Sequence, residues 1–163
     1  MAKTITPDDI VDYFKEIDWP LDGVEEETGR IFTSVKGQNV ILEMEVGLNQ
    51  EWQLLQITLT LPELVPQHRM AEAMALVNRI NYNLPLGHFE IGLESRHLAY
   101  YTAIPVGDLP FIKSQFETLL SWAIDLVDEE HPRLMQGLFS QAPSGEGLSL
   151  DQVRPKPPRR FDA

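Results

Sequence analysis

The sequence contains no cysteine, which excludes a disulfide framework, a thiol nucleophile and a thiolate metal site. It also lacks any apolar run close to the ~18–20 residues with which a helix crosses a bilayer. The segment 1–14 has neither an apolar block nor a small-residue cleavage site, so a signal peptide is not expected. From these absences we predict a cytoplasmic protein that does not enter a membrane.

Basic side chains are scarce, since the chain has 13 Lys and Arg against 25 Asp and Glu and a formal net charge of −12. The deficit belongs to residues 1–132, which carry 8 basic and 22 acidic side chains, whereas residues 133–163 carry 5 and 3. A domain with a net charge of −14 repels phosphate backbones, so we expect no direct nucleic-acid binding by the folded part. The length of 163 residues, with 43% hydrophobic, suits one domain with a sizeable core.

Hydrophobic periodicity predicts the element order α-β-β-β-α-β-β-α. Apolar residues recur at three- and four-residue steps in three segments and alternate with polar residues in the others. Thr6 is placed to cap the first helix, with Pro7 in its first turn. We expect helices over 7–17, 70–81 and 110–131, strands over 31–35, 40–46, 54–61, 89–93 and 98–104, a solvated acidic loop over 21–29 and a hairpin turn over 94–96.

The alternation in the strands is typical of antiparallel pairing with one covered face. We therefore predict a two-layer α+β fold over residues 1–139, a five-stranded antiparallel sheet covered by helices on one face. Residues 140–163 lack periodicity and are predicted to be a disordered, proline-rich basic tail. A plain solubilising tail fits this composition best, although a basic arm for an anionic partner or a proline-rich ligand is also compatible with Arg154, Lys156, Arg159 and Arg160.

No residue pattern in the sequence predicts catalysis, a metal or a cofactor. The four histidines lack the i, i+4 spacing of a helical zinc site, and the serines and glycines form no nucleophile elbow or phosphate loop. His88 and Glu90 share one sheet face, where pairing of Glu94 with His97 would place Tyr101 opposite Glu90. We keep a small enzyme or ligand-binding domain, with a polar pocket near His88, Glu90 and Tyr101, as the alternative function.

The sheet face turned away from the core carries aromatic and aliphatic side chains among carboxylates such as Glu43 and Glu45. Such a mixture is typical of an interaction surface if the apolar residues are contiguous, and ordinary if they are scattered. We expect them to be contiguous. The predicted partner-binding residues on this face are Ile41, Trp52, Leu54, Ala99 and Tyr101.

The helix predicted over 70–81 has two distinct sides. Its expected core stripe consists of Met70, Met74, Val77 and Ile80. The opposite side is small and weakly polar at Ala71, Ala75 and Asn78. That composition suits the close approach of another helix, and it equally suits an alanine-rich side in contact with solvent.

One stretch resembles a known family. Residues 77–106, VNRINYNLPLGHFEIGLESRHLAYYTAIPV, are similar to the heart of the YbjN family, above all in the blocks LPLGHFEI and LAYYTAIP. That family has the fold of the class I type III secretion chaperones, which form dimers and hold other proteins. The resemblance implies a bacterial regulator or chaperone-like protein without catalysis, and a dimer interface at Ala71, Met74, Ala75 and Asn78.

Composition, pattern and resemblance lead to one prediction, a non-enzymatic cytoplasmic homodimer. It would hold a client protein on an apolar sheet and helix surface, in a chaperone-like or regulatory role. The expected partners are a second copy of the chain and another protein. No cofactor, no membrane and no nucleic acid on the folded domain are expected.

Overall fold

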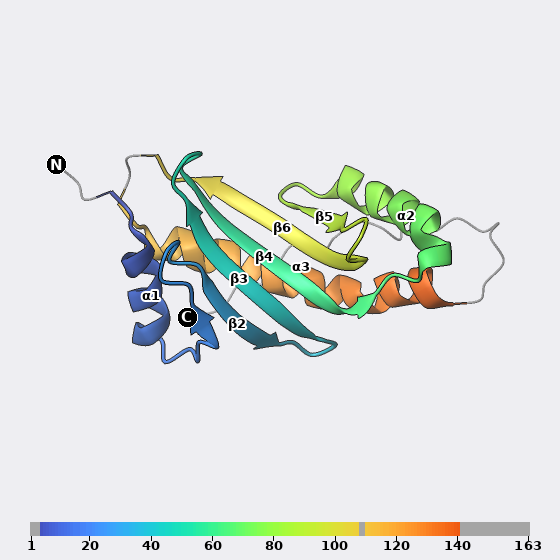
Figure 1. Cartoon of the computed structure of the whole chain (residues 1–163), viewed down its shortest axis with the longest axis horizontal. Helices are drawn as coiled ribbons and strands as arrows, with labels where there is room; N and C mark the ends of the chain where they lie inside the picture. Colours follow the sequence, from blue (N-terminus) through green and yellow to red (C-terminus); the bar gives the residue numbers. More distant parts are fainter. Residues whose placement is uncertain (1–3, 108–109, 141–163) are drawn as a thin grey trace.

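The computed structural model of the protein describes residues 4–107 and 110–140. Within these ranges three α-helices, a short 3-10 helix and six strands form an α+β fold, shown in Figure 1. The prediction of a disordered tail concerns residues that lie almost entirely outside these ranges. The elements are α1 (Pro7–Glu16), β1 (Gly23–Val24), β2 (Ile31–Lys36), β3 (Ile41–Asn49), β4 (Leu54–Leu64), η1 (Gln67–Arg69), α2 (Met70–Asn83), β5 (His88–Ile91), β6 (His97–Pro105) and α3 (Lys113–Phe139).

The strands join one antiparallel sheet in the order β1-β2-β3-β4-β6-β5. In Figure 1, α3 runs lengthwise along the sheet, α1 lies at one end of it and α2 lies beside β5 toward the other end. The register carries one row of buried residues across four strands, from Ile31 through Val46 and Ile57 to Thr102. The predicted α+β class and the alternation of the long strands are therefore confirmed.

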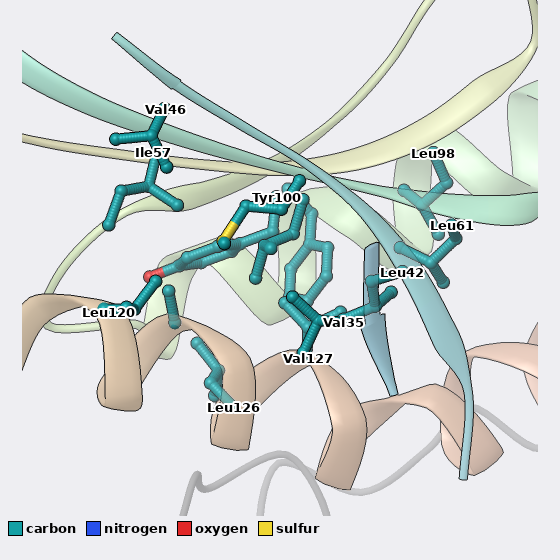
Figure 2. Packing of buried hydrophobic residues seen from close by; sticks show 14 of the residues in the cluster. Val35, Leu42, Val46, Ile57, Leu61, Leu98, Tyr100, Leu120, Leu126 and Val127 are labelled. Carbon is teal, nitrogen blue, oxygen red and sulfur yellow. The ribbon is translucent and has the colours of Figure 1, made fainter. Parts of the chain in front are cut away.

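The core lies between the sheet and α3. Figure 2 shows strand side chains such as Leu42 and Ile57 directed toward Leu120, Leu126 and Val127 of α3. Burial of each such side chain stabilises the fold by roughly 1.5–3 kcal/mol, which makes this layer the main source of stability. No described helix covers the opposite face of the sheet.

The sheet has six strands, so the predicted number of five is wrong. The additional strand is β1, which lies within the segment expected to be an acidic loop and pairs with Phe32 and Ile31 of β2. β4 also passes Pro62, its expected end, with a register shift against β6 between Thr60 and Leu64. Proline cannot donate a hydrogen bond to a neighbouring strand, so strands tolerate a proline where the pairing is irregular. Pro62 lies at such a place.

α3 begins at Lys113 and runs through Pro132 to Phe139, so its expected end near His131 is wrong. A proline inside a helix costs about 3 kcal/mol, because it lacks an N–H and its ring crowds the preceding turn. Beyond the proline, Leu134 and Leu138 are only 0% and 2% exposed. Burial of two leucines contributes about 1.5–3 kcal/mol each, which offsets that cost.

α2 presents most of the expected side to the core, but not at Met74. Its buried residues are Ala73, Leu76, Val77 and Ile80, whereas Met74 is 49% exposed. α3 approaches this side closely, since a Cβ added at Gly137 would lie 2.7 Å from Leu76 Cδ2. The expected stripe is therefore wrong at Met74.

The β5–β6 hairpin has a different register from the one considered from the sequence. Tyr101 lies opposite His88, and Ala99 lies opposite Glu90. The connection occupies residues 92–96, because the Arg96 N–H donates to the Gly92 carbonyl at 2.8 Å. Pairing of Glu94 with His97 is therefore wrong. Compared with that register, β6 is shifted by two residues along β5, so Tyr101 lies opposite His88 instead of Glu90.

Candidate interaction surface

The outward sheet face is polar at its centre. Its rows follow from the strand registers, and each of the two central rows includes at least one carboxylate. One row consists of Phe32, Glu45, Thr58, Tyr101 and His88. The next row consists of Ser34, Glu43, Thr60, Ala99 and Glu90.

The five residues predicted to bind a partner do not form one apolar patch. Ile41, 59% exposed, is the first residue of β3, and Trp52, 70% exposed, lies in the turn between β3 and β4. At about 3.3 Å per residue, a strand of 9 residues separates them by roughly 27 Å. Leu54, at the Trp52 end, is partly buried; between the two ends, Tyr101 is partly buried and Ala99 is buried. The expected contiguity is wrong, and partner binding by these residues stays a prediction.

His88, Glu90 and Tyr101 lie together on this open face. His88 Nε2 is 3.5 Å from a Glu90 carboxylate oxygen, and the His88 and Tyr101 ring centroids are 5.3 Å apart. Gln56 Nε2 donates a hydrogen bond to the Tyr101 hydroxyl. These three residues line neither the groove described next nor the small hollow between β6 and the start of α3. In the described part of the chain, no three His, Cys, Asp or Glu residues are grouped to hold a metal.

A polar groove of about 330 Å³ lies on the outward face, at the end where β3 turns into β4. Gly47 faces outward opposite Gln56, and its lack of a side chain keeps this space open. Periodicity did not predict the groove, because it forms between a loop and a turn whose separation depends on strand register. Its lining includes Glu27, Arg30, Glu45, Gly47, Gln50 and Gln56.

α2 carries a continuous exposed stripe. The predicted dimer contacts Ala71, Met74, Ala75 and Asn78 are all exposed, and so is Tyr82, at 86%. Steps of three and four residues place these positions along one side of the helix. We call the five residues the α2 stripe. Tyr82 is not among the contacts predicted from the sequence, although its spacing of four from Asn78 is a usable signal.

The outer edge of β5 is closed by α2. Asn81 Nδ2 donates to the Phe89 carbonyl at 2.8 Å, and Asn81 Oδ1 accepts from the Phe89 N–H at 2.7 Å. The amide thus occupies both backbone groups that a further strand would pair with at this residue. Nearby, the buried Tyr100 hydroxyl donates to the Leu86 carbonyl at 2.8 Å and fixes the loop before β5. Burial raises the pKa of Tyr100, so this hydroxyl keeps its proton.

Ionisable side chains on α3 are buried away from both hollows. His131 Nε2 lies 3.0 Å from a Glu63 carboxylate oxygen on β4. Arg133 donates to the two carboxylate oxygens of Glu130 at 2.9 and 3.1 Å. Burial raises the pKa of Glu130, an effect that the Arg133 guanidinium partly opposes. None of these residues lines either hollow, so we assign them to stability rather than to a binding site.

Among the residues that the structure describes, no helix has both the length and the apolarity to cross a membrane. A comparison with curated proteins gives no match. Residues 6–134 match the family model of YbjN, described as "Putative bacterial sensory transduction regulator". This range takes in every described strand, α1, α2 and most of α3, and the chain therefore belongs to the YbjN family.

Proposed function

We propose that the protein is a non-enzymatic homodimer that binds another protein, in a chaperone-like or regulatory role. The observation that carries the proposal is the α2 stripe, which exposes Met74 and Tyr82 beside small residues. The outward sheet face supplies a second uncovered surface. The description of the YbjN family as a sensory transduction regulator is consistent with a regulatory or protein-binding role.

The α2 stripe suits a second copy of the same helix. Ala71 and Ala75 allow two helix backbones to approach closely, and Met74 adapts to an irregular neighbour. Tyr82 supplies the kind of large amphipathic side chain that is enriched at interface centres. Because each copy would present the same patch, the expected arrangement is a two-fold dimer.

A client protein would lie across the outward face rather than extend the sheet. Strand addition needs a free row of backbone groups. Asn81 occupies those of Phe89 at the β5 edge, and β1 at the opposite edge has only 2 residues. The proposed client contacts are Ile41 at one end of the face, Trp52 and Leu54 at the other, and Ala99 and Tyr101 between them.

Light scattering tests the dimer. Two chains of 18.6 kDa give a molar mass of about 37 kDa. Ala71→Arg/Ala75→Arg places two charges within the α2 stripe and is expected to give a monomer, because unpaired charges buried at an interface oppose association. Thr118→Arg adds a charge at an exposed position of α3 and should leave the dimer intact. A monomeric wild-type chain, or a dimeric stripe variant, argues against an interface at α2.

Affinity purification from native cells tests the client surface. Trp52→Ala/Tyr101→Ala is expected to reduce the captured partner at least several-fold. Leu93→Ala, which removes an equally exposed apolar side chain in the β5–β6 turn, should capture as much as the wild type. A partner set that the double substitution leaves unchanged removes the outward face from the proposal. Fractionation of the same cells tests the proposed cytoplasmic location, which the lack of cysteine favours.

A further inference from the structure

The polar groove is bordered by negative charge. Three consecutive exposed glutamates, 25–27, lie on its loop side, and the last of them lines it. Glu45 also lines the groove, and Glu51 follows on the turn at its other side. Arg30 is the one cation that lines it among the described residues, and it lies 3.2 Å from Glu45. The surplus of carboxylates predicts that a ligand of this groove is cationic.

The chain itself contains a cationic segment of this kind. Residues 152–161 have four basic side chains and no Asp or Glu, whereas residues 1–132 carry the net charge of −14. These ten residues follow the part of the chain that the structure describes. We propose that residues 154–160, which read Arg-Pro-Lys-Pro-Pro-Arg-Arg, dock in the polar groove of the same molecule.

An exposed tryptophan provides a second match to this segment. Residues 155–158 read Pro-Lys-Pro-Pro, and such sequences favour a polyproline II helix that docks on aromatic surfaces. Trp52, 70% exposed, lies in the turn that borders the groove, where its backbone N–H donates to Asn49 Oδ1 at 3.0 Å. An indole face attracts Lys and Arg as well as proline. Trp52 beside carboxylates therefore suits a segment in which prolines and cations are interspersed.

The connecting chain is long enough to reach the groove. Arg69 holds the end of α3 by donating to the Ser140 carbonyl at 2.8 Å, beyond the point where His131 meets Glu63 of β4. From Ser140 the groove lies roughly 14 Å back along α3, about 20 Å along β4 and about 10 Å across the sheet. The residues 141–153 span up to about 43–47 Å when extended. Residues 154–160 therefore reach their own groove without unfolding α3.

Docking would give the tail a regulatory role. The segment would cover the end of the outward face that holds Trp52, where the proposed function places part of a client. A bound tail would then compete with the client for that end. The docking depends on the groove, its charges and Trp52, whereas the competition also requires the proposed function.

Paramagnetic broadening of NMR signals tests the docking in the full chain. Because the chain has no cysteine, Ala163→Cys provides a single site for a nitroxide spin label. We expect the amide signals of Thr28, Gly47 and Gln50 to lose more than half of their intensity, and those of Ala71 to keep theirs. Raising the salt concentration from 0.05 to 0.5 M should restore the lost intensity, because the Debye length falls to about 4 Å.

Charge variants test whether docking in the groove causes the broadening. In the spin-labelled chain, Glu27→Gln/Glu45→Gln should raise the intensity of the broadened amide signals at least twofold. Arg159→Gln/Arg160→Gln should have the same effect. The control Glu94→Gln/Glu117→Gln removes the same charge at exposed positions that do not line the groove and should leave the broadening unchanged.

Three outcomes overturn the docking proposal: broadening that is strongest outside the groove, broadening that the groove variant leaves as in the control, and broadening that arises only between molecules. The last is recognised by mixing a spin-labelled chain with an isotope-labelled chain that has no spin label. Repeating the measurement with Ala71→Arg/Ala75→Arg separates a failure of docking from a failure of the dimer.

Discussion

Asn39, in the β2–β3 turn, donates a hydrogen bond from Nδ2 to the backbone carbonyl of Asp128 on α3, at 3.0 Å. In an uninterrupted helix this carbonyl accepts from the N–H four residues later, but residue 132 is proline and has no N–H. The turn therefore supplies the donor that Pro132 lacks. Because the Asp128 carbonyl has this donor, α3 continues beyond Pro132 for another two turns toward α2.

Asn39→Ala is expected to lower the free energy of unfolding by about 1–2 kcal/mol, because the Asp128 carbonyl loses its donor. In a Pro132→Ala background the alanine N–H can serve that carbonyl, so the same substitution should cost about 1 kcal/mol less. Urea unfolding of the four proteins measures the difference. Gln38→Ala, at the exposed neighbouring position, is the control and should change stability little. If Asn39→Ala lowers the free energy of unfolding equally in the two backgrounds, then Asn39 does not replace the N–H that Pro132 lacks.

The Asp128 side chain fixes the same turn, and we predict that Gly37 is required for this contact. A Cβ at Gly37 would lie 2.0 Å from Asp128 Oδ1, so Gly37→Ala should destabilise the fold by about 1–3 kcal/mol. Asp128→Ala should cost about 2–4 kcal/mol, because it leaves the buried Val40 N–H and two part-buried N–H groups of the turn without their acceptor. The carboxylate accepts from the backbone N–H groups of Gln38, Asn39 and Val40 at 3.0, 2.9 and 3.2 Å.

A double-mutant cycle separates the two effects. In the Asp128→Ala background the carboxylate that a Cβ would meet is absent, and the nearest remaining atom is the Val40 carbonyl oxygen at 3.0 Å. Gly37→Ala should therefore cost less than half of what it costs in the wild type. Chemical denaturation of the single and double variants provides the comparison. Glu129→Ala, next to Asp128 but exposed, should change stability by less than about 0.5 kcal/mol. Additive costs would mean that the carboxylate is not what excludes a side chain at residue 37.

Elements governed by local chemistry could be predicted from the sequence. α1 was expected over 7–17 and spans Pro7–Glu16, because Thr6 and Asp9 form a capping contact, with the Thr6 N–H donating to Asp9 Oδ2 at 2.8 Å. α3 was expected to end before Pro132, and it does not. The donor that replaces the proline N–H comes from Asn39, 89 residues before Asp128, so no local rule could indicate it.

The surfaces were predictable to the extent that they depend on periodicity alone. Periodicity placed Ala71, Ala75 and Asn78 on the side of α2 away from the core, and they are exposed, because helical spacing fixes the side of a helix that each residue occupies. It also placed Met74 in the core stripe, and that prediction is wrong. Alternation likewise directs Glu43 and Tyr101 to the outward face. Contiguity on a sheet depends on the register between strands, which separates Ile41 from Trp52 by the length of β3 and creates the polar groove. Sequence alone does not give that register.

Asn81 protects the β5 edge, and its loss should be visible in solution behaviour. Asn81→Ala leaves the N–H and carbonyl of Phe89 without their partner and is expected to destabilise the fold by about 1–3 kcal/mol. The freed edge should also increase aggregation, because unpaired strand groups template further pairing. Unfolding curves and light scattering over time measure the two effects. In the control Asn83→Ala, the lost amide contacts only the Arg79 carbonyl of its own helix, at 3.1 Å, so neither property should change appreciably.

Glu130 should make stability depend on pH in an unusual direction for a carboxylate. Burial raises its pKa in the folded state above the ordinary value of 4.5, and Arg133 opposes this only in part. Between the unfolded and the folded pKa, the folded state binds more protons than the unfolded state, so the free energy of unfolding falls as the pH rises. The contribution of Glu130 is therefore fully present below about pH 4.5 and is lost as the pH rises through the raised pKa.

Glu130→Gln removes this titration, because an amide stays neutral at every pH. Relative to the wild type, the variant should gain stability as the pH rises from 4.5 toward neutrality, by at most about 1.4 kcal/mol per pH unit. Urea unfolding of both proteins at a series of pH values gives the difference, in which titrations common to both cancel. Glu94→Gln, at an exposed position in the β5–β6 turn that does not act on Glu130, should follow the wild type. If the wild type instead gains stability over Glu130→Gln with rising pH, then Arg133 stabilises the carboxylate more than burial destabilises it, and the pKa of Glu130 is lowered rather than raised.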